Sequence, residues 1–177
     1  MHLHSLKPKP LPNFVPTSFW IVQLEDHDPT YCQDAVQALE KIGPLEPSVV
    51  PALGRMLKDR DPLVRVGAAR ALGQFGTEAQ PALAALLATL DDDNHFVRNN
   101  IVAALRRIDP RDQAVLAALV RASKDPSAAV RLTAIKFLGE IGRGPKGSLA
   151  AMREALMDRD PDVRQFAAEA LARSYLP

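Results

Sequence analysis

The residues from Asp59 to Gly76 form a motif that returns along the chain at a fixed interval of 33 residues. Each later copy pairs valine with arginine, and an apolar residue and a leucine follow at fixed positions. The shared aspartates are Asp26, Asp59, Asp92, Asp125 and Asp158, and the shared arginines are Arg65, Arg98, Arg131 and Arg164. Cys32 replaces the arginine in the first copy. A fixed period of this length indicates a stack of repeated units, each contacting only its neighbours.

Each copy of the motif carries the start signal of a helix at the same place. The side chains at this position can accept a hydrogen bond from an unpaired backbone N–H, as N-caps do. Three of the five caps are followed by proline, which suits the first helical position. The caps are Asp28, Asp61, Asn94, Ser127 and Asp160, and the glycines expected to end these helices are Gly43, Gly76 and Gly142.

A second set of helices is expected between the motif helices, because the apolar residues there recur at helical spacing. A first helix is expected at about residues 17–25, and Trp20 and Leu24 fall at the repeat positions of Leu53 and Leu57. The others are expected at about 48–58, 78–90, 112–123 and 146–157. The repeated unit is therefore a helical hairpin, and the chain is predicted to be all-α, with about five hairpins and about ten helices.

Composition supports a helical stack and narrows the function. Hydrophobic residues make up 47% of the chain but aromatic residues only 5%, which suits closely packed helices. The net charge of +1 gives no electrostatic argument for binding nucleic acid or an anionic membrane. A single cysteine and the lack of a signal-like or membrane-spanning apolar run predict a soluble, cytoplasmic protein. Residues 1–16 are proline-rich and expected to be extended or disordered, whereas residues 17–177 form the repeat array.

The motif resembles a known family of repeats. Its pattern, D-x-D-P-x-V-R-x-x-A-A-x-A-L-G-x-x-G, spans Asp59 to Gly76 and recurs more loosely from Asp158 to Leu171. It is similar to the short HEAT-like repeat, the subtype also found in phycobilin lyases, and the similarity runs from about Thr17 to the end. The resemblance implies an α-solenoid, with motif helices on the concave surface and the intervening helices on the convex one. It implies no single activity, because this fold hosts many functions.

The residues shared by all repeats are predicted to have a structural role, because every repeat must pack against its neighbours in the same way. We expect the arginines to bind the loop aspartates and carbonyls beside them, which fixes the register between hairpins. The alanines that follow, such as Ala68 and Ala104, are expected to let helices approach closely. Leu72 and its counterparts are expected in the core.

A binding site is expected where the copies differ, on the exposed stripe of the motif helices. This stripe is polar with scattered basic and apolar residues, which fits a protein or peptide surface better than a phosphate track. An ordinary solvated face is the alternative. The predicted residues are Gln33, Gln37 and Lys41, then Val66, Arg70 and Gln74, then Phe96, Asn99, Asn100 and Arg107, then Leu132, Lys136 and Glu140, and finally Gln165, Glu169 and Arg173.

No catalytic, metal or cofactor site is expected. None of the four histidines lies in H-E-x-x-H or in a His-Glu pair of the type that HEAT-like metal hydroxylases use, and the His2 and His4 pair is read as incidental. Cys32 occupies the position of the shared arginine and is expected to be an inert, buried or half-buried thiol. The segment from Gly142 to Gly147 lacks the features of a phosphate-binding loop.

These observations predict a non-enzymatic scaffold that binds a protein or peptide segment on the concave face. One alternative is an accessory role like that of the phycobilin lyases, with a tetrapyrrole in the groove, although Tyr31 and Tyr175 are the only tyrosines. A second is nucleic-acid binding, which the acidic residues on the same surface disfavour. No membrane partner is expected, and the terminal helices could support self-association.

Overall fold

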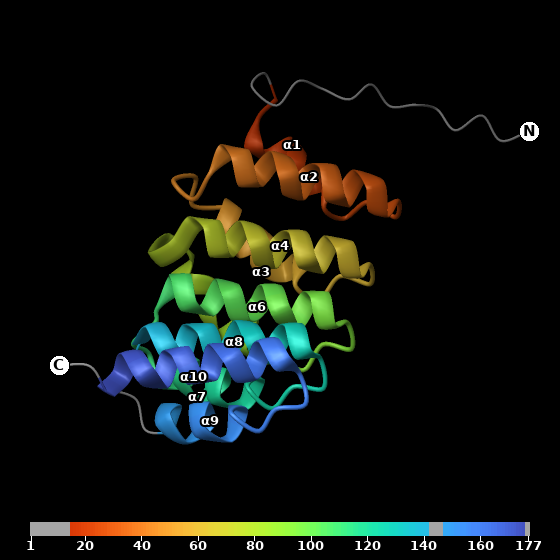
Figure 1. The fold of residues 1–177 in the computed structure, drawn as a ribbon. Helices are drawn as coiled ribbons and strands as arrows, with labels where there is room; N and C mark the ends of the chain where they lie inside the picture. Colours follow the sequence, from red (N-terminus) through yellow and green to blue (C-terminus); the bar gives the residue numbers. More distant parts are fainter. Residues whose placement is uncertain (1–14, 142–146, 176–177) are drawn as a thin grey trace, which may run out of the picture.

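The computed structural model describes residues 15–141 and 147–175, and these form a single helical stack (Figure 1). The described residues contain ten α-helices and one 3-10 helix, and they contain no β-strand. The prediction of an α-solenoid with about ten helices is therefore confirmed.

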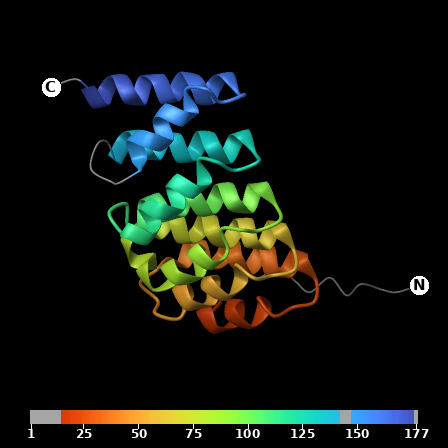
Figure 2. The ribbon, with the colours of Figure 1, turned by 90° about the horizontal axis from the view of Figure 1, so that it is seen from below.

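Five long helices contain the repeated motif and lie side by side on one face of the stack (Figure 1). These motif helices are α2 (Pro29–Ile42), α4 (Pro62–Phe75), α6 (His95–Ile108), α8 (Ala128–Ile141) and α10 (Pro161–Tyr175). Shorter helices form a second layer behind them (Figure 2). They are α1 (Thr17–Gln23), α3 (Val49–Met56), α5 (Leu83–Ala88), α7 (Gln113–Ala122) and α9 (Ser148–Ala155).

The motif helices begin where the capping residues predict. Asp28 accepts a hydrogen bond from the backbone N–H of Thr30 at 2.9 Å, and Asp61 accepts one from Leu63 at 2.7 Å. Asn94 caps α6 and Asp160 caps α10 in the same way. Since these bonds satisfy donors that the helix itself leaves unpaired, they fix the starting point of each motif helix.

The shorter helix of the third hairpin differs from the prediction. Residues 78–90 were expected to form one helix, but residues Gly76–Ala82 form a 3-10 helix, η2, and α5 begins only at Leu83. Pro81 lies inside η2 and cannot donate the backbone hydrogen bond that a continuous α-helix needs. The chain therefore passes from α4 through η2 into α5 without an intervening loop.

The two ends of the stack and the glycine stops are described in part. Gly43 and Gly76 follow α2 and α4 with φ angles of 89° and 59°, which L residues rarely adopt. The expected stop at Gly142 and most of the proline-rich segment expected at residues 1–16 lie outside the described residues. No helix within the described residues combines the length and the apolar character needed to cross a membrane.

One apolar core runs through the stack between the two layers. Leu39, Leu72, Leu105 and Leu138 share one repeat position on the motif helices, and each is fully buried. Leu53, Leu86 and Leu119 face them from the shorter helices and are also fully buried. Because every hairpin buries the same positions, the shared apolar residues form the core between repeats and are not exposed for binding.

Candidate functional site

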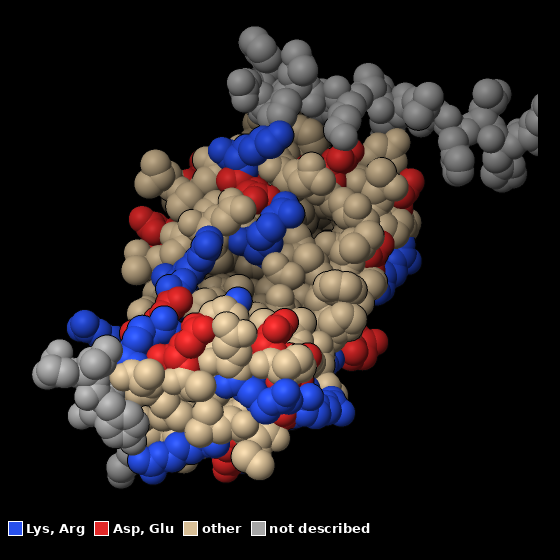
Figure 3. Space-filling model, viewed as in Figure 1, with Lys and Arg blue, Asp and Glu red and all other residues tan. Residues whose placement is uncertain are grey.

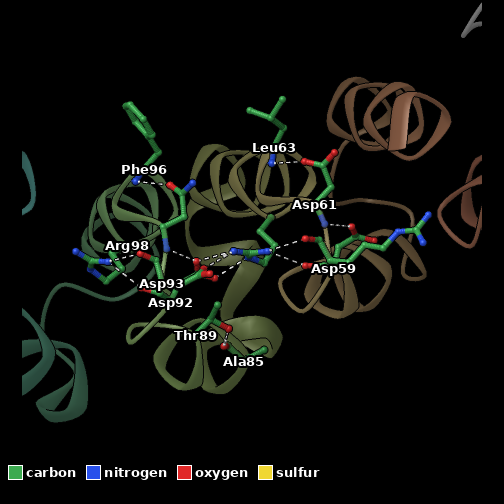
Figure 4. Close-up of polar contacts among 12 residues, drawn as sticks. Asp59, Asp61, Leu63, Ala85, Thr89, Asp92, Asp93, Phe96 and Arg98 are labelled. Carbon is green, nitrogen blue, oxygen red and sulfur yellow. Dashed lines mark hydrogen bonds and ion pairs between the residues drawn. The ribbon is translucent and has the colours of Figure 1, made fainter. Parts of the chain in front are cut away.

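A ladder of arginines and aspartates fixes how the motif helices lie beside one another (Figure 4). Arg65 donates from Nε and Nη2 to the two carboxylate oxygens of Asp92, at 2.6 and 2.7 Å. Its Nη1 donates to the backbone carbonyl of Asp59 at 2.9 Å. One guanidinium group thus joins the loop of its own repeat to the loop of the next, which confirms the structural interpretation of these residues.

The same bonds recur at the next two steps of the ladder. Arg98 binds Asp125 at 2.7 and 2.8 Å, and Arg131 binds Asp158 at 2.7 Å through both nitrogens. The hydrogen bond from Arg131 is the main reason that the pKa of Asp158 lies below its usual range. Burial raises the pKa of Asp125, but bonds from Arg98 and the backbone outweigh this and lower it overall.

The ladder changes at both ends of the described stack. The buried thiol of Cys32 lies 3.2 Å from the carbonyl of Asp26, the contact that Nη1 makes in later repeats. Burial raises the pKa of this thiol, and the carboxylates of Asp59 and Asp26 raise it further. Cys32 thus stands where a ladder arginine would, as predicted, and it is buried. Arg164, at the other end, keeps its bonds to the carbonyls of Asp158 and Arg159 but is exposed.

The face formed by the motif helices is hollowed along its middle (Figure 3). All sixteen residues predicted to bind a partner lie on these five helices, and none of them is buried. Phe96 is 61% exposed at the start of α6. Figure 4 shows that its ring and the side chain of Leu63 leave α6 and α4 in the same direction. We name this surface, consisting of the outward positions of α2, α4, α6, α8 and α10, the hollowed face.

Several predicted residues are brought into contact with neighbours on this face. Arg70 forms an ion pair of 2.8 Å with Glu40, and Glu140 forms one with Arg106. The ammonium group of Lys136 lies 4.2 Å from the ring centre of Phe166. Gln165 donates to Glu169 at 2.9 Å. Among the described residues, Lys41, Arg107 and Arg173 form no such pair.

Other residues of the hollowed face were missing from the prediction. Leu63, which is 62% exposed, occupies the repeat position of Phe96 in the preceding helix. Applying that one position to every repeat would have identified it. Glu40 and Arg106, together with Phe137 beneath Arg106 and Phe166 beneath Lys136, also contribute. The sequence alone does not identify these residues as easily, because each of them contacts a residue of a neighbouring repeat.

The spacing between motif helices alternates along the stack. A Cβ atom on Gly73 would lie 2.9 Å from the Cα of Ala104, and one on Gly139 would lie 2.5 Å from the Cβ of Ala170. Glycine therefore allows α4 to pack closely on α6 and α8 to pack closely on α10. Glu40 and Arg106 hold the same repeat position at the other two interfaces, where ion pairs join the helices.

The motif-helix layer also contains a surface hollow and a buried amide oxygen. A surface hollow of about 620 Å³ lies between α8 and α10, lined by Lys136, Gly139, Glu140, Phe166, Arg173 and Ser174. In α6, the side-chain oxygen of Asn99 is buried and accepts no hydrogen bond within the described part of the chain. In the part of the chain that the structure describes, no group of three or more His, Cys, Asp or Glu could hold a metal ion.

Comparison with protein families and solved structures gives consistent matches. A family model described as HEAT repeats matches residues 17–106 and 86–172. A search among curated proteins finds no match. A designed armadillo repeat protein in complex with the peptide (KR)4 has a TM-score of 0.70 at 21% identity, over 89% of this chain and 81% of that chain.

Two natural assemblies have similar chains. One is the complex of CpcE and CpcF of phycocyanin lyase from Nostoc sp. PCC7120, with a TM-score of 0.68 at 20% identity, over 99% of this chain and 70% of that chain. The other is the Pds5-Scc1 complex, with a TM-score of 0.69 at 15% identity, over 89% of this chain and 28% of that chain. At these identities the likeness concerns the fold alone.

Proposed function

Because the chain belongs to the HEAT repeat family, we propose that it is a non-enzymatic scaffold that binds a protein or peptide segment on its hollowed face. One observation carries this proposal. The residues shared between repeats are occupied by the core and the arginine ladder, whereas the exposed positions of the motif helices differ from one repeat to the next. Recognition of a particular partner requires such unlike positions, since identical surfaces would bind every register equally.

The shape and chemistry of the face support the same function. It is concave, and it mixes the exposed apolar side chains of Leu63 and Phe96 with arginines and amides. Aromatic residues and arginine are enriched at protein interfaces. Among the structural neighbours, the designed armadillo protein carries a bound peptide and Pds5 is seen with Scc1. A solenoid of this kind therefore has a surface suited to an elongated partner.

The proposal is tested by selecting binding peptides and locating where they bind. Peptides selected from a random display library on the wild-type protein would be measured by fluorescence anisotropy. The site variant combines Phe96→Ala, Asn99→Ala and Arg107→Ala. Its matched control replaces Met157, Gln113 and Arg121 by alanine, which removes the same classes of side chain from exposed positions outside the hollowed face.

We expect the site variant to weaken binding by about 10-fold or more, because hot-spot truncations typically cost over 1 kcal/mol each. The control should bind like the wild type. Equal affinity of the wild type and the site variant, with both folded by circular dichroism, would refute the proposal. A tetrapyrrole role is tested separately by adding bilin, for which we expect no change in the absorption spectrum.

A further inference from the structure

The row of the hollowed face nearest the C-terminal ends of the motif helices carries unpaired positive charge. This row consists of Lys41, Gln74, Arg107, Glu140 and Arg173, one residue from each motif helix. Its one carboxylate, Glu140, pairs with Arg106. Lys41, Arg107 and Arg173 are exposed, and among the described residues they have no carboxylate partner. We refer to these five positions as the basic row.

The neighbouring positions increase this excess of positive charge. Arg70 remains 49% exposed despite its pair with Glu40, and Lys136 contacts the ring of Phe166 rather than an acid. Figure 3 shows Lys and Arg side chains bordering one side of the hollow. The half of the face nearer the C-terminal ends of the motif helices holds six cations and three carboxylates, and a fourth carboxylate, Asp34, lies beside it at the repeat position of Asn100. The net charge of the whole chain, by comparison, is only +1. The cations are Lys41, Arg70, Arg106, Arg107, Lys136 and Arg173, and the carboxylates are Glu40, Glu140 and Glu169.

The opposite edge of the face is apolar over its central repeats. Leu63 and Phe96 are 62% and 61% exposed and point in the same direction (Figure 4). Thr30 and Ala129 continue this edge without charge, and only Asp162 on α10 is acidic. Half-buried Val66 and Leu132 form the floor between the two edges. The face therefore has a basic side and an apolar side that run parallel along the stack.

From this arrangement we propose that the hollowed face binds an extended segment with acidic side chains along one edge and apolar side chains along the other. The inference rests on the proposed scaffold function and specifies the partner's chemistry. Packed helices lie about 8–10 Å apart, and three residues of polyproline II rise about 9 Å per turn. An acidic residue at every third position would therefore reach each motif helix in turn and would meet a cation of the basic row on every second helix. The apolar residues would face Leu63 and Phe96.

A different role for the basic row has to be separated from binding. A lysine or arginine in the last turn of a helix stabilises that helix by about 0.3–1 kcal/mol through the helix dipole. Lys41 and Arg107 lie in the last turns of α2 and α6 and can act in this way without any partner. The stability of each variant is therefore measured along with its affinity.

The test uses three blocked peptides that differ in one feature each. The probe is (Glu-Pro-Leu)4, in which proline favours the extended form. The charge-reversed control is (Lys-Pro-Leu)4, and the control without apolar side chains is (Glu-Pro-Ser)4. Affinity is measured by fluorescence anisotropy at low and moderate salt, since screening weakens exposed charge pairs.

The protein variant combines Lys41→Gln, Arg107→Gln and Arg173→Gln, because Gln74 shows that the basic row accommodates glutamine. Its matched control combines Arg55→Gln, Lys58→Gln and Lys124→Gln, which removes three exposed cations from the layer of shorter helices. We expect the first variant to bind the probe about 10-fold more weakly, from three exposed charge pairs of about 0.5 kcal/mol each. The control should bind the probe like the wild type, and both should melt within a few degrees of it.

Any of three results would overturn the inference. If (Lys-Pro-Leu)4 bound to the wild type as tightly as the probe, the face would not select acidic side chains. If the basic-row variant bound the probe as tightly as the wild type does, the basic row would not contribute to binding. If (Glu-Pro-Ser)4 and a single-stranded RNA of 12 nucleotides bound as tightly as the probe, the face would recognise negative charge alone and a nucleic acid would be the better partner. Library-selected peptides without acidic residues that still depend on Phe96 would leave the scaffold function standing while this inference failed.

Discussion

Replacing Arg131 by methionine tests the central structural claim, that the arginine ladder joins neighbouring repeats. The Arg131 and Asp158 side chains are 6% and 11% exposed, and two bonds of 2.7 Å connect them. Arg131 also donates to the carbonyls of Asp125 and Pro126. The substitution removes these bonds and leaves Asp158 half-buried without its cation. Charge-assisted bonds of this kind contribute about 1.5–3 kcal/mol, and breaking a buried pair costs about 3–5 kcal/mol. We therefore expect the free energy of unfolding to fall by about 3 kcal/mol.

The same substitution at Arg164 is the internal control. Arg164 occupies the same repeat position, but it is exposed, and among the described residues it binds the carbonyls of Asp158 and Arg159 and no carboxylate. We expect its replacement by methionine to cost about 1 kcal/mol or less. The assay is urea unfolding followed by circular dichroism at pH 7, with Asp158→Asn completing a double-mutant cycle with Arg131→Met. Because a repeat array can lose its end hairpin first, the slope of the transition must be compared between variants.

The ladder also predicts how the effect of Arg131→Met depends on pH. Asp158 has a lowered pKa in the folded protein, chiefly through its bond from Arg131. A carboxyl group of this kind stabilises the fold above its unfolded pKa of about 4, and this contribution disappears as the pH falls through the lower folded value. The difference between wild type and Arg131→Met should therefore be constant from about pH 6 to 8 and shrink below about pH 4. A cost that was equal at Arg131 and Arg164, or a difference unaffected by acid, would refute the reasoning.

Two further predictions concern packing and the thiol. Gly73→Ala should lower stability by about 1–3 kcal/mol in urea unfolding, because the new Cβ would press on the Ala104 backbone. Gly54→Ala, whose Cβ would meet only an ordinary contact of 3.8 Å with Ala82, should instead be neutral or stabilising by up to about 1 kcal/mol. Cys32 should react with a thiol reagent only slowly in the native protein and at once in denaturant, since the thiol is buried and its pKa is raised. Fast native reaction would show that the first hairpin opens.

The sequence predicted the stack well because each structural task is repeated. Asp28, Asp61 and Asn94 stand at one phase of the period, and each caps a helix as expected. The ladder was predictable for the same reason, since a residue required between every pair of repeats appears as a column. The error at residues 78–90 arose where one repeat departs from the others, because Pro81 and a continuous connection from α4 produced a 3-10 helix there. A feature that occurs in one repeat alone cannot be predicted from the pattern that the repeats share.

The contacts on the hollowed face were harder to predict, because they depend on how far apart the motif helices lie. Arg106 reaches Glu140 across one interface, whereas at the same repeat position Gly73 brings α4 against Ala104 of α6. Helices that pack through glycine leave no room for a long side chain between them. Helices joined by an ion pair lie far enough apart for long side chains to fit between them. The repeat position of Gly73 and Arg106 therefore determines which cations are paired and which stay available. The sequence shows only that residues differ at this repeat position. That Arg106 is paired with Glu140 while the neighbouring Arg107 is free to bind a partner is seen only in the folded stack.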